Sequence, residues 1–224
     1  MHHQLRNKYE LTVQQNIFLA KKTLSENIHY AGQFENIETT FAQTETIVKG
    51  LSVSGVTTHD VQVILNMKKA WFYVLNHVDQ HFDIETLCKI NSFVAYNESL
   101  EWGVLHNGKV GISGVKYEPT VPIRAEVDNK INAIFEHANL SDTYKAIHLM
   151  LFAMRSQLFW DGNKRTAIIG ANMLLIQKGC GLISVTEAHF EAFNTLLSTF
   201  YETNDDTIID DFIYENCLYG IEFA

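Results

Sequence analysis

Proline is almost absent from this chain. The 224 residues contain only Pro119 and Pro122, which lie three positions apart. Because proline breaks the interior of a helix, its absence elsewhere allows long helices on both sides of that short segment. Hydrophobic residues make up 46% of the chain, which is enough for a sizeable core. The sequence therefore predicts an all-α protein that is interrupted near its middle.

Apolar residues recur at helical spacing along most of the chain, and capping residues and glycines mark helix ends. The helices that we expect cover about residues 5–27, 31–49, 58–77, 83–96, 125–137, 142–157, 164–178, 186–201 and 206–219. The helix over 164–178 is apolar on nearly all sides, which predicts a place at the centre of the domain. No domain boundary is evident from composition. We divide the chain into an N-terminal helical segment, residues 1–50, and a helical core, residues 51–224.

The stretch between about residues 102 and 122 does not follow the helical pattern. Asn107 and Gly108 form a hairpin turn signal, and residues 110–117 are strand-like with interspersed glycines. A single small hairpin in a helical chain is seldom the core of the fold. We therefore expect a β-hairpin that forms a flap over a site.

Charge and composition argue against several classes of function. The formal net charge of −9 argues against broad nucleic-acid binding, which requires clustered cations. No apolar run approaches the ~18 to 20 residues that a membrane span needs, and the first ten residues have no stretch typical of a signal peptide. The three cysteines lack metal-ligand spacing, which fits reduced thiols. We expect a cytoplasmic protein with no membrane or nucleic-acid partner.

The most distinctive stretch runs from Gln157 to Ala167 and reads Gln-Leu-Phe-Trp-Asp-Gly-Asn-Lys-Arg-Thr-Ala. It is a short loop that leads into the N-terminus of the apolar helix. Free backbone N–H groups and the helix dipole make such a place attractive to anions.

Five consecutive residues in this loop suit a phosphate and a metal ion. Gly162 lets the backbone approach a phosphate closely, Asn163 offers an amide, and Lys164 and Arg165 offer cations. Asp161 is suited to hold magnesium against phosphate oxygens. A helix cap with solvated cations explains the same residues, because Asp-Gly-Asn is common turn chemistry.

The stretch resembles the signature of Fic proteins, which reads His-x-Phe-x-Asp/Glu-Gly-Asn-Gly/Lys-Arg. Phe159 and every residue from Asp161 to Arg165 match this signature in register. The flap of the family is similar to residues 110–122, in which Val110, Ile112 and Gly114 match. The resemblance spans about residues 31–200, and it implies a Fic-type helical domain with a small flap and an N-terminal helical extension.

The resemblance also implies a role for each matching residue. Asp161 would coordinate magnesium between the nucleotide phosphates. Asn163, with the backbone of Gly162 and Lys164, would form the anion hole for the α-phosphate. Arg165 would pair with the outer phosphates.

The activity that the resemblance implies is nucleotidyl transfer. The loop over residues 157–166 would bind ATP, or another nucleotide, with magnesium and transfer AMP or a related group to a hydroxyl of a target protein. Val110, Ile112 and Gly114 would align that target, which the sequence does not identify. A homodimer is compatible with this interpretation.

The chain departs from the signature at the general base. The family has a histidine there, and this chain has Gln157, whose amide has no useful basicity. One consequence is a weak or inactive Fic member that acts as a nucleotide-binding, regulatory or toxin-neutralising protein. Another is a substitute base, for which His106 and His148 are candidates, although a structural role suits both better. A third is different chemistry, in which Gln157 only orients a nucleophile.

A regulatory motif is also partly present. Residues 31–36, Ala-Gly-Gln-Phe-Glu-Asn, resemble the inhibitory Fic motif Ser/Thr-x-x-x-Glu-Gly/Asn, whose glutamate pairs with a second arginine of the signature. Ile168 occupies the position of that arginine here. Glu35 would instead reach Arg165 or Lys164 and occlude the outer phosphates. The other interpretation is an ordinary helix glutamate.

Overall fold

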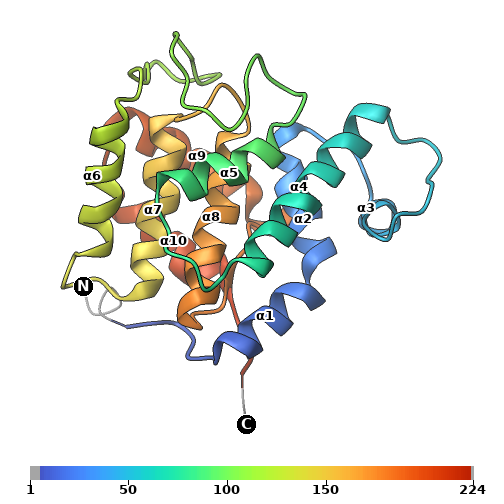
Figure 1. Cartoon of the computed structure of the whole chain (residues 1–224), viewed down its shortest axis with the longest axis horizontal. Helices are drawn as coiled ribbons and strands as arrows, with labels where there is room; N and C mark the ends of the chain where they lie inside the picture. Colours follow the sequence, from blue (N-terminus) through green and yellow to red (C-terminus); the bar gives the residue numbers. More distant parts are fainter. Residues whose placement is uncertain (1–5, 223–224) are drawn as a thin grey trace.

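The computed structural model of the chain describes residues 6–222. Its helices are α1 (Val13–Lys22), α2 (Leu24–Gly32), α3 (Phe41–Val48), α4 (Thr58–Asn76), α5 (Ile84–Val94), α6 (Arg124–Phe135), α7 (Asp142–Ser156), α8 (Asn163–Lys178), α9 (Glu187–Thr203) and α10 (Thr207–Asn216). A 3₁₀ helix (Gln33–Glu35) follows α2, and two short strands are β1 (Leu182–Ile183) and β2 (Leu218–Tyr219). The expected all-α class is confirmed (Figure 1).

Some sequence predictions extend beyond the described range. Residues 1–5 of the stretch that was read for a signal peptide lie outside it, as do the outer ends of the segments 1–50 and 51–224. Within residues 6–222, no helix combines the length and the apolar character that are needed to cross a bilayer.

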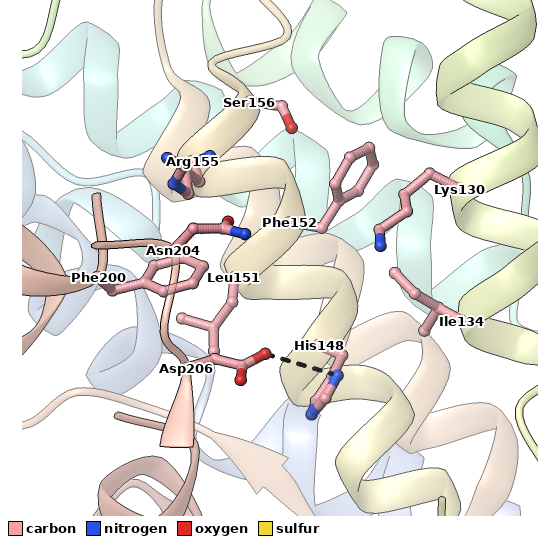
Figure 2. Close-up of a pocket in the computed structure, with 10 residues that line it drawn as sticks. All are labelled: Lys130, Ile134, His148, Leu151, Phe152, Arg155, Ser156, Phe200, Asn204 and Asp206. Carbon is pink, nitrogen blue, oxygen red and sulfur yellow. Dashed lines mark ion pairs between the residues drawn. The ribbon is translucent and has the colours of Figure 1, made fainter. Parts of the chain in front are cut away.

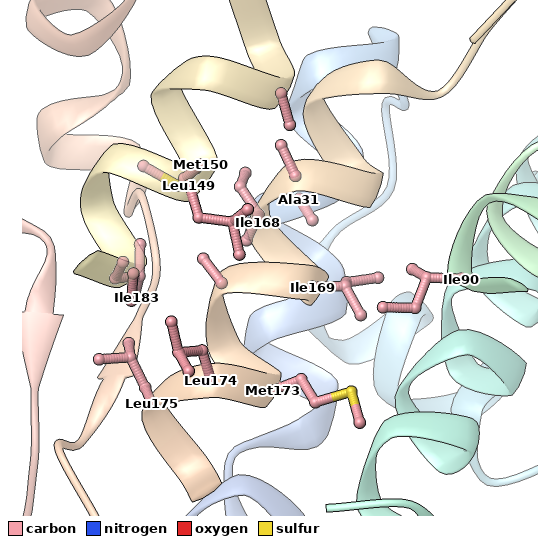
Figure 3. Packing of buried hydrophobic residues seen from close by; sticks show 14 of the residues in the cluster. Ala31, Ile90, Leu149, Met150, Ile168, Ile169, Met173, Leu174, Leu175 and Ile183 are labelled. Carbon is pink, nitrogen blue, oxygen red and sulfur yellow. The ribbon is translucent and has the colours of Figure 1, made fainter. Parts of the chain in front are cut away.

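Helix α8 lies at the centre of the fold, as its apolar sequence predicts (Figure 1). It packs against α1, α4, α5 and α7, and all its residues from Arg165 to Ile176 are buried. Figure 3 shows Ile169 directed toward Ile90 of α5. Burial of each such aliphatic side chain contributes roughly 1.5–3 kcal/mol. This packing fixes the N-terminus of α8, where the candidate loop enters.

The N-terminal helices differ from the prediction. The expected helices over 5–27 and 31–49 are replaced by α1, α2, the 3₁₀ helix and α3. Asn36 adopts a left-handed conformation with φ of 54° that ends the 3₁₀ helix. Thr40 then starts α3 through a reciprocal capping box with Gln43. Local capping chemistry therefore sets these boundaries rather than apolar periodicity.

Helices α1 and α2 belong to the same core as α8. Leu19, Ile28 and Ala31 are buried in one hydrophobic cluster with Ile169 and Met173. The N-terminal segment therefore shares its packing with the rest of the chain, and the division at residue 50 stays a prediction.

The predicted hairpin is not formed. No strand occurs between residues 101 and 123, where the chain makes turns and irregular loops. A two-residue hairpin turn of the Asn-Gly type needs positive φ at both positions, and neither Asn107 nor Gly108 has one. Instead, the backbone N–H of His106 donates to the carbonyl of Leu158 at 3.0 Å. We call residues 104–117 the flap segment.

The small sheet lies elsewhere. Strands β1 and β2 pair antiparallel, with Leu182 opposite Tyr219. The hydroxyl of Tyr219 is hydrogen-bonded to Thr23, at 2.9 Å, and to Asn27. These bonds attach the end of the chain to the junction between α1 and α2.

Candidate functional site

The loop that the sequence singles out joins α7 to α8. Gln157 ends α7 and Gly162 precedes α8, and both adopt left-handed conformations, with φ of 47° and 69°. A side chain at Gly162 would be strained by the positive φ, and its Cβ would lie 2.8 Å from Cγ1 of Val94. Glycine is therefore required here, where the loop turns against the end of α5.

The side chain of Asn163 holds the loop closed. Its Oδ1 accepts a hydrogen bond from the N–H of Phe159 at 2.9 Å, and its Nδ2 donates to the carbonyl of Phe159 at 2.8 Å. The same Nδ2 lies 3.2 Å from Oε1 of Gln157, whose Nε2 donates to the carbonyl of Met154 at 2.6 Å. Both amides are therefore engaged within the loop, and Gln157 connects the end of α7 to the start of α8.

The first turn of α8 has hydrogen-bond donors without acceptors. Gly162 supplies no capping side chain, and its carbonyl accepts from the N–H of Thr166 at 2.8 Å. Nothing within residues 6–222 accepts a hydrogen bond from the N–H of Asn163, Lys164 or Arg165. Three such groups at the positive end of a buried helix form a place for an anion.

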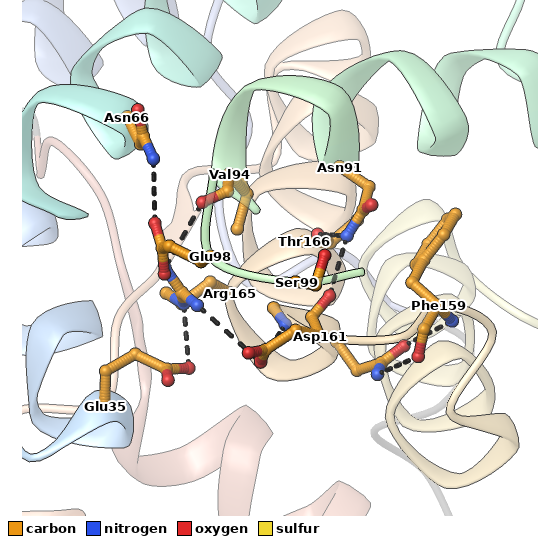
Figure 4. A network of polar contacts seen from close by, with 12 residues as sticks. Glu35, Asn66, Asn91, Val94, Glu98, Ser99, Phe159, Asp161, Arg165 and Thr166 are labelled. Carbon is orange, nitrogen blue, oxygen red and sulfur yellow. Dashed lines mark hydrogen bonds and ion pairs between the residues drawn. The ribbon is translucent and has the colours of Figure 1, made fainter. Parts of the chain in front are cut away.

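The guanidinium of Arg165 is surrounded by carboxylates (Figure 4). Arg165 is 0% exposed, its Nε donates to Oε1 of Glu35 at 2.8 Å, and its Nη1 lies 2.9 Å from Oε2 of Glu98. The Nη1 group also donates to the carbonyl of Val94 at 3.3 Å, and Nη2 lies 4.0 Å from Oδ1 of Asp161. Pairing with outer phosphates, as the resemblance implies, would require Arg165 to exchange these partners.

Glu35 approaches Arg165 from the 3₁₀ helix, although the two residues are 130 positions apart in the chain. Burial raises the pKa of Glu35, and the Arg165 guanidinium partly opposes this rise. The contact that the sequence analysis expected, with Arg165 or Lys164, is therefore made to Arg165. Ile168 is 4% exposed and brings no charge to the site. The inhibitory role of Glu35 stays a prediction.

Three buried polar residues of the site, Asn66, Asn91 and Glu98, were not predicted from the sequence. Asn66 of α4 donates to Oε1 of Glu98 at 2.7 Å. Asn91 of α5 donates to the carbonyl of Asp161 at 2.9 Å and to Oγ1 of Thr166 at 3.1 Å. Both asparagines are 0% exposed. The only signal in the sequence is an amide on an otherwise apolar helix face, which does not reveal its partner.

Asp161 is the carboxylate that suits a magnesium ion. Its side chain is 44% exposed, and its Oδ1 accepts from the N–H of Gly162 at 2.6 Å. Magnesium is usually held by one or two carboxylates together with phosphate oxygens. Within residues 6–222, no group of three or more His, Cys, Asp or Glu side chains is arranged to hold a metal. The residues present fit magnesium only in company with a bound phosphate.

A polar cavity of about 300 Å³ lies beside Lys164, between the 3₁₀ helix, the flap segment and α9. Ile112 and Asn194 line it, together with Tyr201. Tyr201 is 2% exposed, its hydroxyl has no hydrogen-bond partner among residues 6–222, and burial raises its pKa. The Nζ of Lys164 lies 5.7 Å from the centroid of the Phe34 ring at the edge of this cavity. Lys164 and Tyr201 therefore both line this cavity, whereas the Tyr201 hydroxyl itself is buried.

The three flap residues occupy different environments. Ile112 lines the cavity, Val110 is half-buried, and Gly114 is exposed with φ of 76°. In the described part of the chain, no acceptor is bonded to the N–H groups of residues 107–114. The flap segment therefore presents a stretch of backbone N–H groups that have no acceptor among the described residues.

Of the two histidines that were considered as substitute bases, His106 packs against the loop but is buried, and His148 lies away from the loop. His106 is 1% exposed, its Nδ1 donates to the carbonyl of Gly108 at 2.6 Å, and its ring packs edge-on against Trp160. His148 lines a separate cavity of about 320 Å³ between α6, α7 and the connection from α9 to α10 (Figure 2), where its Nδ1 lies 3.9 Å from Asp206. No residue of the loop 157–163 lines that cavity.

Residues 81–175 match the model of the Fic/DOC family. These residues form a Fic domain. The matched residues include α5, the flap segment, α7, the loop and most of α8, which together hold the geometry described above. The Fic signature is present with Gln157 in place of its histidine. No curated protein matches the chain by sequence.

Solved structures share the fold of this Fic domain. Fic-1 from C. elegans has a TM-score of 0.76 at 14% identity, over 90% of this chain and 62% of that one. A Fic domain containing signaling protein from Bacteroides thetaiotaomicron has a TM-score of 0.76 at 14% identity, over 92% and 87%. A Fic family protein from Desulfovibrio desulfuricans has 0.70 at 16% identity, over 90% and 65%. At these identities the likeness establishes the fold.

Proposed function

We propose that this Fic domain binds a nucleotide with a phosphate at the N-terminus of α8. The supporting observation is the first turn of α8, in which the N–H groups of Asn163, Lys164 and Arg165 have no acceptor within residues 6–222. Gly162, which precedes this turn, supplies no side chain that could cap these N–H groups. The ammonium of Lys164 adds a positive charge, because no described carboxylate pairs with it.

The nucleoside would occupy the cavity beside Lys164. Its volume of about 300 Å³ is at the lower end of the range for small-molecule sites, roughly 300–1,000 Å³. Its lining includes the side-chain amide of Asn194, which is suited to hydrogen-bond a base or ribose.

Magnesium would be held by Asp161 and by phosphate oxygens of the nucleotide. When bound, the ion supplies neutralisation of phosphate charge. Two asparagines hold the backbone of the loop that carries Asp161. Asn91 donates a hydrogen bond to the carbonyl of Asp161, and Asn163 is hydrogen-bonded to the backbone of Phe159. These bonds fix the position of the loop backbone at Asp161 relative to the N–H groups in the first turn of α8.

The family generally transfers nucleotide or phosphate groups to proteins. We infer that this chain does not catalyse that reaction. Gln157 cannot accept a proton from a target hydroxyl, and the loss of a general base typically costs about a hundred- to ten-thousand-fold in rate. The side chain of Gln157 is also engaged with Asn163 and Met154. A nucleotide-binding, regulatory role therefore suits the chain better than AMP transfer.

AMP transfer to a protein hydroxyl is the second candidate function. The supporting observation is the flap segment, where the N–H groups of residues 107–114 donate no hydrogen bond within the described residues. An extended target peptide can pair with such backbone by strand addition. A target hydroxyl would then lie near the loop, although no base is supplied by Gln157.

Calorimetry with AMP, ADP and ATP in magnesium buffer tests nucleotide binding. We expect saturable binding by at least one nucleotide and about tenfold weaker binding by Lys164→Ala, because a charge-assisted contact to phosphate is lost. Lys178→Ala is the matched control, since Lys178 is an exposed lysine in the last turn of the same helix. Absence of binding by all three nucleotides would contradict the proposal.

Incubation of lysate with ATP labelled in its α-phosphate tests transfer. The native chain should leave proteins unlabelled, and Gln157→His should produce labelled protein, with Glu35→Gly tested in parallel. Histidine tolerates the left-handed conformation of position 157 better than most residues. Labelling of proteins by the native chain would contradict the inference that it is inactive and would support AMP transfer.

A further inference from the structure

A cavity of about 320 Å³ between α6, α7 and the connection from α9 to α10 lies apart from the proposed nucleotide site (Figure 2). Among the described residues, none lines both this cavity and the one beside Lys164, and the loop over residues 157–163 contributes none. Its volume falls within the range for small-molecule sites, roughly 300–1,000 Å³. Nucleotide binding therefore leaves this cavity without a role.

The middle of this cavity is apolar. Helix α7 lines it with residues that are spaced three or four positions apart: His148, Leu151, Phe152 and Arg155. Such spacing places them in one row along the helix, with the apolar pair between the two polar residues. The polar residues are about 10 Å apart along the helix axis. Apolar side chains from α6 and α9 complete the lining: Ile134 and Phe200.

Two cations without acidic partners line one end of the cavity. Arg155 is half-buried, its Nε donates to the carbonyl of Tyr201 at 3.2 Å, and its guanidinium carbon lies 3.8 Å from the centroid of the Tyr117 ring. Lys130 extends from α6 toward α7 (Figure 2). No carboxylate within residues 6–222 lies at ion-pair distance from either cation. A guanidinium in a fixed position suits a carboxylate, which it can bind through two parallel hydrogen bonds.

The opposite end of the cavity has a carboxylate that is open to a hydrogen-bond donor. The side chain of Asp206 is 43% exposed, and its Oδ2 lies 3.9 Å from Nδ1 of His148, which is beyond hydrogen-bond distance. Asp206 precedes α10, but its side chain does not cap that helix. The Nε2 of His148 is directed instead to Asp210, at 3.6 Å from its Oδ2. The cavity is therefore cationic at one end and accepts hydrogen bonds at the other.

We propose that this cavity binds a small organic carboxylate that has an apolar body and a hydrogen-bond donor at its far end. The carboxylate pairs with Arg155 and Lys130, the body contacts the apolar middle of the cavity, and the donor bonds to Asp206. This site goes beyond the proposed nucleotide binding and does not depend on it.

Calorimetric titration of the native chain with para-hydroxyphenylpropionate tests the site, because this probe has a carboxylate, an aromatic body and a hydroxyl at its far end. We expect saturable binding. Phenylpropionate lacks the hydroxyl and should bind about fivefold more weakly, because one hydrogen bond is lost. Tyramine has an ammonium in place of the carboxylate and should not bind. Inorganic phosphate fills only the cationic end and should bind at least about tenfold more weakly than para-hydroxyphenylpropionate, because it buries no apolar surface.

Variants at the two ends of the cavity test the role of each end. Lys130→Ala should weaken binding of para-hydroxyphenylpropionate about threefold, because an exposed ion pair is lost. Lys21→Ala is the matched control, since Lys21 is an exposed lysine of α1 that does not line the cavity. Asp206→Ala should bring the affinities for para-hydroxyphenylpropionate and phenylpropionate to within about twofold, because the acceptor of the hydroxyl is removed. Arg155→Gln should abolish binding. Thermal denaturation verifies that each variant is folded, and Lys130→Ala with Asp206→Ala supplies the test if Arg155→Gln is not.

Three results would overturn the proposal. The first is the absence of saturable binding of para-hydroxyphenylpropionate by the native chain. The second is binding that Lys130→Ala leaves unchanged, because the probe would then lie elsewhere. The third is displacement of the probe by ATP, which would show that it occupies the nucleotide site. Equal binding of para-hydroxyphenylpropionate and phenylpropionate by the native chain would overturn the role of Asp206. The nucleotide titrations are separate measurements, so failure of this proposal leaves nucleotide binding intact.

Discussion

The side-chain amide of Asn163 forms two hydrogen bonds with the backbone of Phe159, at 2.9 Å and 2.8 Å. Phe159 is 2% exposed and belongs to the hydrophobic core. The amide therefore connects the first residue of α8 to an anchored residue of the loop. This connection fixes the loop that carries Asp161 and Gly162, and it gives Asn163 a structural task besides any contact with a phosphate.

Asn163→Ala should destabilise the fold. Removing the amide leaves the buried N–H and carbonyl of Phe159 unpaired, which costs about 1–3 kcal/mol. We expect a loss of about 2 kcal/mol in the free energy of unfolding, measured by urea denaturation. Asn139→Ala changes an exposed asparagine between α6 and α7 and should stay within about 0.5 kcal/mol of the native chain. Equal effects of the two substitutions would contradict the structural task of Asn163.

Gly162→Ala should cost more than Gly50→Ala. Both glycines have positive φ, 69° and 82°, so alanine is strained at either position by about 1 kcal/mol. The Cβ at position 162 would also lie 2.8 Å from Val94, whereas at position 50 it meets nothing within 4 Å. Overpacking typically adds about 1–3 kcal/mol. Urea denaturation of the two variants measures the difference, and equal losses would show that the loop relaxes freely.

The stability of the chain should fall with pH in the range set by Glu35. Burial raises the pKa of this carboxyl above its ordinary value of 4.5, so the folded chain binds the proton more tightly than the unfolded chain does. The free energy of unfolding therefore decreases as pH rises from about 4.5 through the raised pKa. Glu35→Gln should remove this part of the decline. Thermal denaturation across pH measures both profiles, and parallel profiles would contradict the prediction.

The cysteines should react slowly in the folded chain. Burial raises the pKa of Cys88 to about 11 and that of Cys180 and Cys217 to about 12. The thiolate is the reactive form, so a disulfide reagent at pH 8 should label all three slowly before denaturation and rapidly after it. Absorbance of the released thiol measures the rates. Rapid labelling of one thiol in the native chain would show that its side chain is more accessible than its burial indicates.

Local signals in the sequence determined much of the helical part of the chain. Helix α4 follows the predicted range of residues 58–77 to within one residue, and Asp83 caps α5 as expected through its bond to the N–H of Thr86. The loop before α8 was likewise identified from contiguous residues. Such features depend on neighbours within one or two turns, which a single stretch of sequence contains.

Local sequence signals gave a wrong prediction where a backbone group forms a hydrogen bond with a distant part of the chain. The Asn107–Gly108 pair predicted a hairpin, but the neighbouring His106 bonds to Leu158 in the loop, and residues 110–117 form no strand. The apolar periodicity also predicted one continuous helix over residues 5–27, where the structure has α1 and the start of α2. A turn signal states what a segment prefers in isolation, and contacts with the rest of the fold override that preference.

The sequence by itself determined the helical class, the buried helix and the residues of the loop that precedes it. Only the tertiary structure decided that Arg165 is shared between Glu35 and Glu98, and that Asn66 and Asn91 hold the site from α4 and α5. The physical reason is that a helix and its caps depend on residues close in the chain. The partner of a buried charge depends on which distant elements the packing around α8 brings together.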